Sequence, residues 1–449
     1  MDTKFDAIII GSGIGGLAAA GFLARVGKFK VLVLEKHSER GGQTHVFRRD
    51  GASWDVGVHY IGDMEEGQFG RRLFDFLTDG ALKWNRMPDD FERFIYPGLD
   101  FHVPSDPKRY EQRLIERYPD EAKAIRRYFR DLIAVARWHV LAIQGEMMPS
   151  PLSAALAFWR RFGAKQATQT TANYLDRRFH SPELRALLAS QWGDYGLPPG
   201  ESAFALHALV VSSYFHGAWF PEGGAGRIAR TIEPGIEAQG GTIRVCHEAT
   251  AIIVENGRAA GVTAVDRRGA EPVEVVYRAP IVISDVGATL TYFELLPTDG
   301  EIGQKTAAQR AYIQAIPGGV SAVNLFVRLK APVSSLGVKG ENYWINEAFD
   351  HADLDAHTAQ TLAGEPRHAY LSFPSAKSGD DRFHTAEIIT MLRPEVFDTW
   401  RGTSSGDRGR DYAELKQRIT AGLLRLAERA VPGFCDLVTY SELATPLTV

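Results

Sequence analysis

The amino-terminal segment carries the pattern that most constrains the fold of this chain. An apolar run at 5–10 leads into Gly11-Ser12-Gly13-Ile14-Gly15-Gly16. An alanine-rich helical pattern and a second apolar run at 31–34 follow, and Glu35 closes the segment. This order of strand, glycine turn, helix, strand and acid is the complete dinucleotide-binding βαβ unit. It predicts a bound dinucleotide, whereas a bare GxGxxG would also suit a glycine-rich turn in an ordinary α/β fold.

Each part of this unit has an expected physical role. Gly11 permits the tight turn, Gly13 lets the backbone approach a pyrophosphate, and Gly16 lets the helix pack closely on the strands. Free N–H groups at the start of the helix attract phosphate. Glu35 lies where a carboxylate can accept hydrogen bonds from a ribose diol. Because an acid disfavours a 2′-phosphate there, FAD or NAD fits this site better than NADP.

Composition excludes several other classes of function. The 449 residues carry a formal charge of −4, which argues against a nucleic-acid partner. Cys246 and Cys435 lie far apart without metal-ligand spacing, so we expect reduced thiols and no metal site. The first strand begins within about five residues of the start, which leaves no room for a signal peptide. No apolar run approaches the roughly 18 residues of a membrane span. The expected location is cytoplasmic.

The residues that follow Glu35 distinguish FAD from NAD. Lys36 is next to the acid, and Arg40-Gly41-Gly42 comes shortly after it, close to the nucleotide strand. The stretch Asp55-Val56-Gly57-Val58-His59-Tyr60-Ile61-Gly62 then replaces the ordinary second βαβ unit of an NAD dehydrogenase. Flexible backbone at these glycines suits a ligand that extends past its pyrophosphate. This arrangement favours FAD, with a plain surface turn as the alternative for 40–42.

A second glycine-rich element far along the chain supports the same interpretation. Pro221-Glu222-Gly223-Gly224-Ala225-Gly226 precedes a helical pattern at 227–237, and an Asn256-Gly257 hairpin turn joins two strands. In flavoproteins with such a double glycine the strand that follows lines the adenine with backbone groups, and by spacing Ala249 is the residue expected at that place. An apolar strand at 281–284 ends at Asp285, and we expect it to return the chain to the nucleotide domain. The alternative is an unrelated α+β segment.

These stretches together resemble the phytoene desaturase, carotenoid isomerase and retinol saturase group of FAD-dependent oxidoreductases, in the amine oxidase superfamily. The stretch 55–62 is most similar to the retinol saturase branch. The resemblance implies an α/β fold, in which a Rossmann-like FAD-binding domain is joined to a mixed-sheet substrate domain and a helical cap. It also implies a lipophilic polyene substrate, with NAD(P)H as a candidate electron donor. The implied cofactor-binding residues are Gly11, Ser12, Gly13, Ile14, Gly15, Gly16, Glu35, Lys36, Arg40, Gly41, Gly42, Ala249 and Asp285.

The predicted domains alternate along the chain. Residues 1–90 and 216–315 form the two FAD-binding segments, 91–215 a hairpin and helical cap, and 316–449 the substrate domain. Relatives of this kind continue past a Thr-Pro-Leu segment with a last flavin-contacting element, which this sequence does not contain after 445–447. Two alternatives stay open. One is an amine oxidase-like enzyme with a smaller substrate. The other, which follows from the missing element, is a non-catalytic lipid-binding or chaperone-like protein.

Two further segments carry weaker signals. Residues 152–162 combine apolar and aromatic side chains with Arg160 and Arg161, a composition that suits peripheral contact with a membrane. A packed cap helix with a basic end is the alternative there. His59 and Tyr60 are the candidate catalytic residues, because their motif is predicted to lie next to the flavin, and a structural histidine is the alternative for His59. The oligomeric state does not follow from the sequence.

Overall fold

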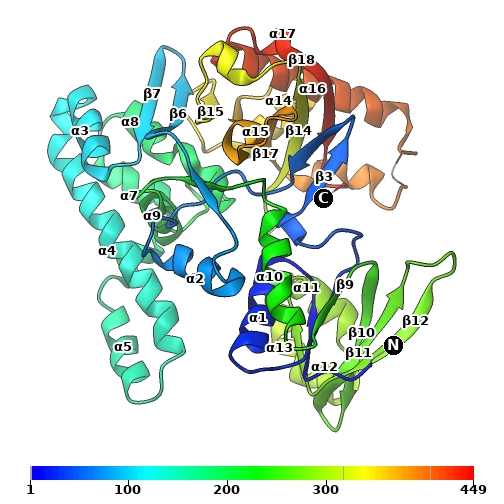
Figure 1. Cartoon of the computed structure of the whole chain (residues 1–449). Helices are drawn as coiled ribbons and strands as arrows, with labels where there is room; N and C mark the ends of the chain where they lie inside the picture. Colours follow the sequence, from blue (N-terminus) through cyan, green and yellow to red (C-terminus); the bar gives the residue numbers. More distant parts are fainter. Residues whose placement is uncertain (1–2, 317, 405, 449) are drawn as a thin grey trace. The chain divides into compact units, whose positions relative to one another are not determined.

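A computed structural model describes residues 3–316, 318–404 and 406–448 of the chain (Figure 1). The chain divides into two compact units. The first unit comprises Met1–His59, Glu66–Asn85 and Phe220–Gly318, and the second comprises Tyr60–Glu65, Arg86–Trp219 and Gly319–Val449. Each unit therefore combines segments that are distant in the sequence.

The first unit is built on a parallel sheet of four strands in the order β13-β1-β2-β9. Strands β1 and β2 are buried along their whole length, as expected for a parallel sheet covered on both faces. Small residues of α1 allow close helix packing, because a Cβ atom added at Gly21 would lie 2.8 Å from Leu77. The elements are β1 (Ala7–Ile10), α1 (Ile14–Arg25), β2 (Val31–Leu34), α2 (Phe69–Thr78), α10 (Arg227–Glu237), β9 (Thr242–Arg244) and β13 (Ile281–Ser284).

A smaller antiparallel sheet completes the first unit. Strands β10 (His247–Glu255), β11 (Arg258–Asp266) and β12 (Val273–Arg278) form this sheet, and the predicted Asn256-Gly257 turn joins the first two. Both turn residues have positive φ angles, as a type I′ turn requires. The remaining elements are the hairpin β3 (Val46–Arg49) and β4 (Ala52–Asp55) and the helices α11 (Ala288–Leu290), α12 (Gly300–Lys305) and α13 (Ala307–Ala315).

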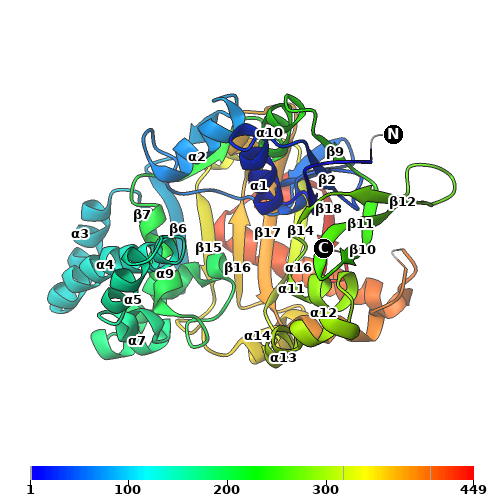
Figure 2. The same cartoon turned by 90° about the horizontal axis from the view of Figure 1, so that it is seen from below.

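The second unit contains a mixed sheet of seven strands in the order β18-β14-β17-β16-β15-β6-β7. The pair β6 and β15 is parallel, and the other neighbours are antiparallel. Helix α16 (Gly409–Ala430) packs across one face of this sheet (Figure 2). The strands are β6 (Asp90–Tyr96), β7 (Leu99–Pro104), β14 (Ser321–Leu329), β15 (Asn342–Asn346), β16 (His368–Ser372), β17 (His384–Leu392) and β18 (Val438–Ala444).

Helices of the second unit pack against the other face of this sheet around an aromatic core. Ser181 caps α8 by accepting a hydrogen bond from the backbone N–H of Leu184, as the Ser-Pro-Glu start predicts. The helices here are α3 (Pro107–Arg117), α4 (Ala122–Glu146), α5 (Leu152–Arg160), α6 (Ala164–Thr168), α7 (Thr171–Arg178), α8 (Pro182–Ala189) and α9 (Phe204–Ser213). Helices α14 (Leu354–Leu362), α15 (Pro374–Ser378) and α17 (Phe434–Leu437) belong to the carboxy-terminal part.

The structure confirms the predicted α/β class. It contains a Rossmann-like sheet, a mixed sheet and a helical region that lies between their segments in the sequence. In the carboxy-terminal part of the second unit, residues Pro374–Ser378 form the short helix α15. Pro374 occupies the first turn of this helix, where a missing N–H costs nothing. Among the described residues, the structure contains no helix that combines the length and the apolar character needed to span a bilayer.

Candidate functional site

The predicted glycine turn joins β1 to α1 in the first unit. Gly11 has a φ of 96°, a backbone conformation that favours glycine. A Cβ atom added at Gly16 would lie 2.3 Å from the carbonyl oxygen of Gly11, so helix and turn pack at backbone distance. Gly13 precedes the helix, and Ile14 begins it with a partly exposed side chain. The turn therefore leaves the amino-terminal N–H groups of α1 close to an open backbone surface.

The loop at 40–42 lies against this turn. A Cβ atom added at Gly42 would lie 2.8 Å from the Cα atom of Gly13, and Gly42 has a positive φ. The backbone N–H of Gly41 donates to Ser12 Oγ over 3.0 Å. Two motifs that the sequence places 29 residues apart are thus in direct contact.

Glu35 is the centre of the hydrogen bonds that hold the two loops together. Its Oε2 atom accepts from the backbone N–H of Ser12 over 3.0 Å and from Ser12 Oγ over 2.6 Å. Its Oε1 atom accepts from the backbone N–H of His37 over 2.8 Å. Since a carboxylate oxygen can accept a second hydrogen bond, Oε1 retains capacity for a ribose hydroxyl. Glu35 is buried, so it fixes the loops as well as offering this acceptor.

Asp285 occupies the amino-terminal end of α1. It follows β13, which pairs in parallel with β1, and its Oδ2 atom accepts from the backbone N–H of Gly16 over 2.7 Å. Cβ atoms added at Gly13 and Gly15 would lie 2.9 Å and 2.6 Å from this carboxylate. A negatively charged group thus already lies where the helix dipole favours an anion.

The second glycine-rich element also reaches this part of the first unit. Asp55 Oδ1 accepts from the backbone N–H of Ala225 over 2.6 Å, which ties the 55–62 motif to the 221–226 turn. The backbone N–H of His247 donates to the carbonyl of Glu35, and Ala249 follows two residues later on β10. Ala249 is therefore on a strand that begins beside the predicted ribose acceptor.

The two basic residues of the predicted site behave differently. Lys36 is exposed, whereas Arg40 is half-buried and forms an ion pair with Glu233 of α10. Burial raises the pKa of Glu233, and the charge of Arg40 acts in the opposite direction. Arg40 therefore anchors the loop to α10.

The glycine turn, the amino terminus of α1 and the buried Glu35 are groups that suit a dinucleotide. They offer close backbone approach, N–H donors for phosphate and an acceptor for a ribose hydroxyl. At the amino terminus of α1, however, the Asp285 carboxylate already takes the place of an anion. Each predicted cofactor-binding residue belongs to the first unit.

Tyr60 lies in the second unit, in a cluster of acidic groups. Its hydroxyl lies 2.5 Å from Glu92 Oε1 on β6 and 2.5 Å from Asp194 Oδ2 on the 3₁₀ helix η3 (Ser190–Tyr195). Glu92 also accepts hydrogen bonds from Gln191 Nε2 over 2.6 Å and from Trp344 Nε1 over 2.8 Å. We call Tyr60, Glu92 and Asp194 the acid cluster.

Burial governs the electrostatics of the acid cluster. Glu92 is fully buried, and this burial, together with repulsion from the charge of Asp194, raises its pKa to about 8. Burial also raises the pKa of Tyr60 well above its ordinary value, and the charges of Asp194 and Glu92 act in the same direction. Part of Asp194 is exposed, but its carboxyl group lies in the same desolvated environment, which raises its pKa to about 7, and the hydrogen bond from Tyr60 acts in the opposite direction. The cluster thus joins two carboxyl groups whose pKa values are both raised by burial.

Sequence reasoning found one member of this cluster and missed two. Tyr60 was predicted as a catalytic candidate, and it lies between two carboxyl groups. Glu92 and Asp194 were missed, although a glutamate flanked by Phe91 and an apolar strand pattern is a signal for a buried acid. His59, the other candidate, is half-buried in the first unit, after β4.

Comparison with known proteins assigns the chain to a family. The flavin containing amine oxidoreductase family matches residues 14–381. The chain belongs to this family. It is accordingly an FAD-dependent oxidoreductase, as the sequence predicted, and the predicted group of relatives is confirmed.

Individual relatives narrow the placement within the family. The all-trans-retinol 13,14-reductase of Rattus norvegicus is 33% identical over 99% of this chain and 75% of its own length. The chloroplastic prolycopene isomerase of Daucus carota is 24% identical over 99% of this chain and 70% of its own length. The crystal structure of an oxidoreductase from Methanosarcina mazei has a TM-score of 0.63 at 16% identity, covering 99% of this chain and 88% of that one. This last likeness concerns the fold.

Proposed function

We propose that this chain is an FAD-dependent reductase that saturates a carbon–carbon double bond of a retinoid or a related carotenoid polyene. The observation that carries the substrate class is the 33% identity with a 13,14-reductase of all-trans-retinol over almost the whole chain. The weaker similarity to an isomerase of prolycopene supports the wider class of conjugated, lipophilic substrates.

Residues of the first unit would hold the cofactor. The backbone at Gly13 and Gly16 would face the pyrophosphate, Glu35 Oε1 would accept a ribose hydroxyl, and β10 at Ala249 would line the adenine. Asp285 would have to yield its place at the start of α1 to the pyrophosphate, because both are anionic. When bound, FAD supplies reversible hydride transfer.

The first prediction concerns activity. Purified protein is expected to show a flavin absorption spectrum and, after anaerobic reduction, to be reoxidised by all-trans-retinol with loss of polyene conjugation. The measurement combines flavin absorbance with mass analysis of the retinoid, in which a gain of two hydrogens identifies saturation. Replacing the chemical reductant with NADPH or NADH tests whether a nicotinamide serves as the electron donor.

Other outcomes of the same experiment would contradict the proposal. A retinoid or carotenoid product of unchanged mass would indicate an isomerase. A bound flavin whose absorbance does not respond to polyenes but is bleached by amines would indicate an amine oxidase. Protein that releases no FAD on denaturation would support the non-catalytic lipid-binding alternative.

We also propose that the second unit docks on a bilayer through an exposed apolar patch. Helix α5 folds back beside the carboxy-terminal end of α4 (Figure 1), and none of its residues is buried. Its Phe158 and the following Phe162 are 60% and 67% exposed. The patch consists of Val140, Leu141, Ile143, Met147, Met148, Leu152, Phe158, Trp159 and Phe162, each a large exposed hydrophobic residue.

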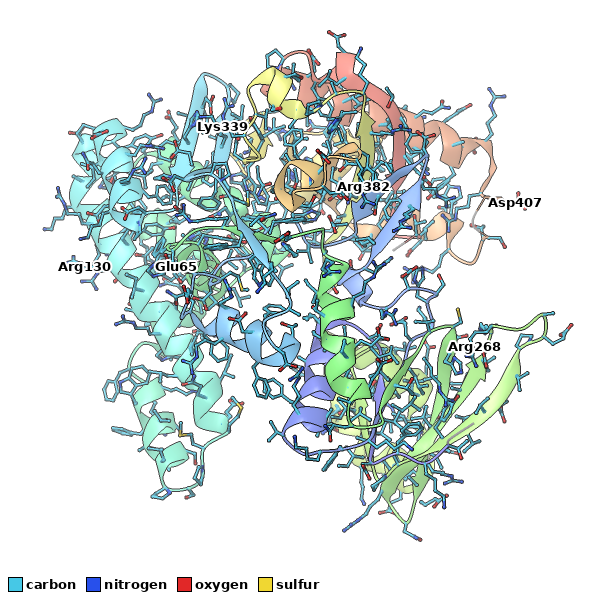
Figure 3. All side chains as sticks on the ribbon, viewed as in Figure 1. Glu65, Arg130, Arg268, Lys339, Arg382 and Asp407 are labelled. Carbon is cyan, nitrogen blue, oxygen red and sulfur yellow. The ribbon has the colours of Figure 1, made fainter. Side chains whose placement is uncertain are left out.

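Charge near the patch supports a lipid partner. Arg161 lies beside Phe158, with its guanidinium carbon 6.0 Å from the ring centroid, and Arg160 pairs with Glu146. Apolar and aromatic side chains next to arginines are typical of helices that lie in the bilayer interface. Nearer the amino-terminal end of α4, the exposed Arg130 projects away from the helix (Figure 3). A lipophilic substrate would gain from such contact, because it could leave the bilayer without crossing much water.

The second prediction tests this surface. Replacing both Phe158 and Phe162 with glutamate is expected to weaken binding to vesicles of mixed phosphatidylcholine and phosphatidylglycerol by more than about 100-fold, since each phenylalanine buried in the bilayer contributes roughly 1.5–3 kcal/mol. Vesicle co-sedimentation measures the change. The matched control is Phe69→Glu on α2, where the side chain is 72% exposed but lies outside the patch. Equal binding by the double variant and the control would contradict the proposal.

A further inference from the structure

The side chain of Asp285 lies over the glycine turn at which we place the cofactor. The sheet fixes its position, because Asp285 directly follows β13 and its backbone N–H donates to the carbonyl oxygen of Ile10, at the end of β1, over 2.8 Å. From there the carboxylate reaches the start of α1, where Oδ2 accepts from the backbone N–H of Gly16 over 2.7 Å. All three residues belong to the first unit, so this arrangement does not depend on the second.

The carboxylate covers the backbone surface on which a phosphate would lie. Cβ atoms added at Gly13, Gly15 and Gly16 would lie 2.9 Å, 2.6 Å and 3.1 Å from its oxygen atoms. A phosphate oxygen that approached Gly13 or Gly15 from this side would therefore meet the carboxylate instead of open backbone. The side-chain position of Asp285 in this structure and a phosphate on this face of the turn exclude each other.

The hydrogen-bond donors of the turn are divided between Asp285 and a future ligand. The first N–H groups of a helix have no acceptor within the helix. In α1, the N–H of Gly16 is bound to Asp285, whereas those of Ile14 and Gly15 form no hydrogen bond within the part of the chain that the structure describes. A phosphate bound to these two donors would lie next to the carboxylate on the third donor.

The charge of Asp285 adds to this conflict. Asp285 has no basic partner at ion-pair distance among the described residues, and the nearby Arg40 of the 40–42 loop is paired with Glu233. A pyrophosphate brings further negative charge to the same helix start, and like charges in contact repel each other. Because the Asp285 side chain is exposed, rotation into solvent can relieve both the overlap and the repulsion.

We propose that Asp285 is an internal competitor of the cofactor, an inference that rests on the FAD site proposed above. In the cofactor-free chain its carboxylate occupies the phosphate position and stabilises the start of α1. FAD binds to the fraction of molecules in which this side chain has rotated away, and its apparent affinity is lower by that fraction. The site thus binds phosphate-bearing ligands less tightly than its glycine turn alone would allow.

The third prediction uses ADP as the probe beside FAD, because ADP carries the adenosine and a diphosphate but no flavin ring. Asp285→Asn and Asp285→Ala are each expected to bind both ligands about 10-fold more tightly than the native chain, since each variant removes the competing charge. Isothermal titration calorimetry on the full chain freed of FAD measures the dissociation constants. The gain of Asp285→Asn should shrink as salt is added, because salt screens the repulsion between exposed charges.

Asp6→Asn is the matched control for net charge. Asp6 is an exposed acid of the same unit, and its Oδ2 atom likewise accepts from one backbone N–H, that of Lys30, over 2.8 Å. It precedes β1 at the end of the strand opposite to the glycine turn. This variant also removes one negative charge, but it should leave both dissociation constants unchanged.

Thermal unfolding of the FAD-free chain supplies a second readout with the opposite sign. Asp285→Ala leaves the N–H of Gly16 without its acceptor, so its unfolding midpoint should be lower by about 1–4 °C. A competitor therefore stabilises the free chain and weakens binding. A residue that holds the cofactor would instead strengthen binding, and its loss would weaken it.

The outcomes separate this inference from the proposed function. Tighter binding of ADP and FAD by both Asp285 variants, together with a lower unfolding midpoint of FAD-free Asp285→Ala, would support the competitor. If the native chain binds both ligands and the Asp285 variants bind them no more tightly than Asp6→Asn does, the competitor is overturned and the FAD site stands. If neither the native chain nor any variant binds ADP or FAD, the proposed FAD site fails, and the competitor fails with it.

Discussion

Replacement of Glu92 by glutamine is expected to remove a large part of the pH dependence of stability in the native chain, to which Asp194, with a pKa that burial raises to about 7, also contributes. Glu92 has a folded-state pKa of about 8, against an ordinary value of 4.5, because it is fully buried and lies near Asp194. The folded protein therefore keeps a proton that the unfolded chain releases between these two values. Each pH unit in this window lowers the free energy of unfolding by about 1.4 kcal/mol. The stabilisation is complete below about pH 4.5 and is lost as the pH rises through about 8.

Urea unfolding at a series of pH values measures this effect. The difference in unfolding free energy between the native chain and Glu92→Gln should change by about 4 kcal/mol from pH 5 to pH 8, in favour of the variant at higher pH. Glutamine keeps the size of the side chain and resembles the neutral acid, so the variant is expected to fold. Tyr96→Phe, which leaves the acid cluster untouched, should keep the native slope. A difference between native chain and Glu92→Gln that does not vary with pH would contradict the prediction.

The Rossmann-like sheet could be predicted from the sequence because its determinants are local. The fully apolar strands β1 and β2 and the glycine turn between β1 and α1 are visible in a short stretch of sequence. The return of the apolar strand at 281–284 to the nucleotide domain was also predicted, and the structure adds that this strand, β13, pairs in parallel with β1.

The acid cluster could not be predicted in the same way. Glu92, Asp194 and Tyr60 are separated by up to 134 residues, and their contact depends on how β6, η3 and the 60–65 segment pack. Sequence pattern marks a buried strand but does not show which polar side chain on it finds a partner. The edge strand β18 was missed for a similar reason, because its burial comes from long-range pairing with β14.

The exposure of α5 likewise could not be predicted from the sequence. An apolar helix with a basic end suits a packed cap and a membrane surface equally well, since both bury the same side chains. The structure leaves Phe158 and Phe162 exposed, which removes the packed-cap alternative for these two side chains. Tertiary context therefore decides between two interpretations that composition leaves equal.

Replacement of Gly13 by alanine is expected to remove FAD without unfolding the protein. Gly13 has φ −59° and ψ 170°, angles that alanine readily adopts. The added methyl group would lie 2.9 Å from Asp285 Oδ2, the far end of a side chain that can move. It would also project onto the backbone surface that we propose for the pyrophosphate. Affinity for FAD should therefore fall on the order of 100-fold, equivalent to about 3 kcal/mol.

Flavin fluorescence quenching on titration of the FAD-free protein measures this affinity, and thermal unfolding checks the fold. Gly200→Ala is the matched control, because its Cβ atom would meet no described atom within 4 Å. Gly16→Ala supplies the contrast, since its Cβ atom would lie 2.3 Å from the backbone oxygen of Gly11 and should destabilise the folded protein itself. Wild-type affinity in Gly13→Ala would mean that the pyrophosphate does not lie on this turn. A Gly13→Ala variant that stays folded but loses FAD would support a pyrophosphate bound at the glycine turn, because the added methyl group changes little else.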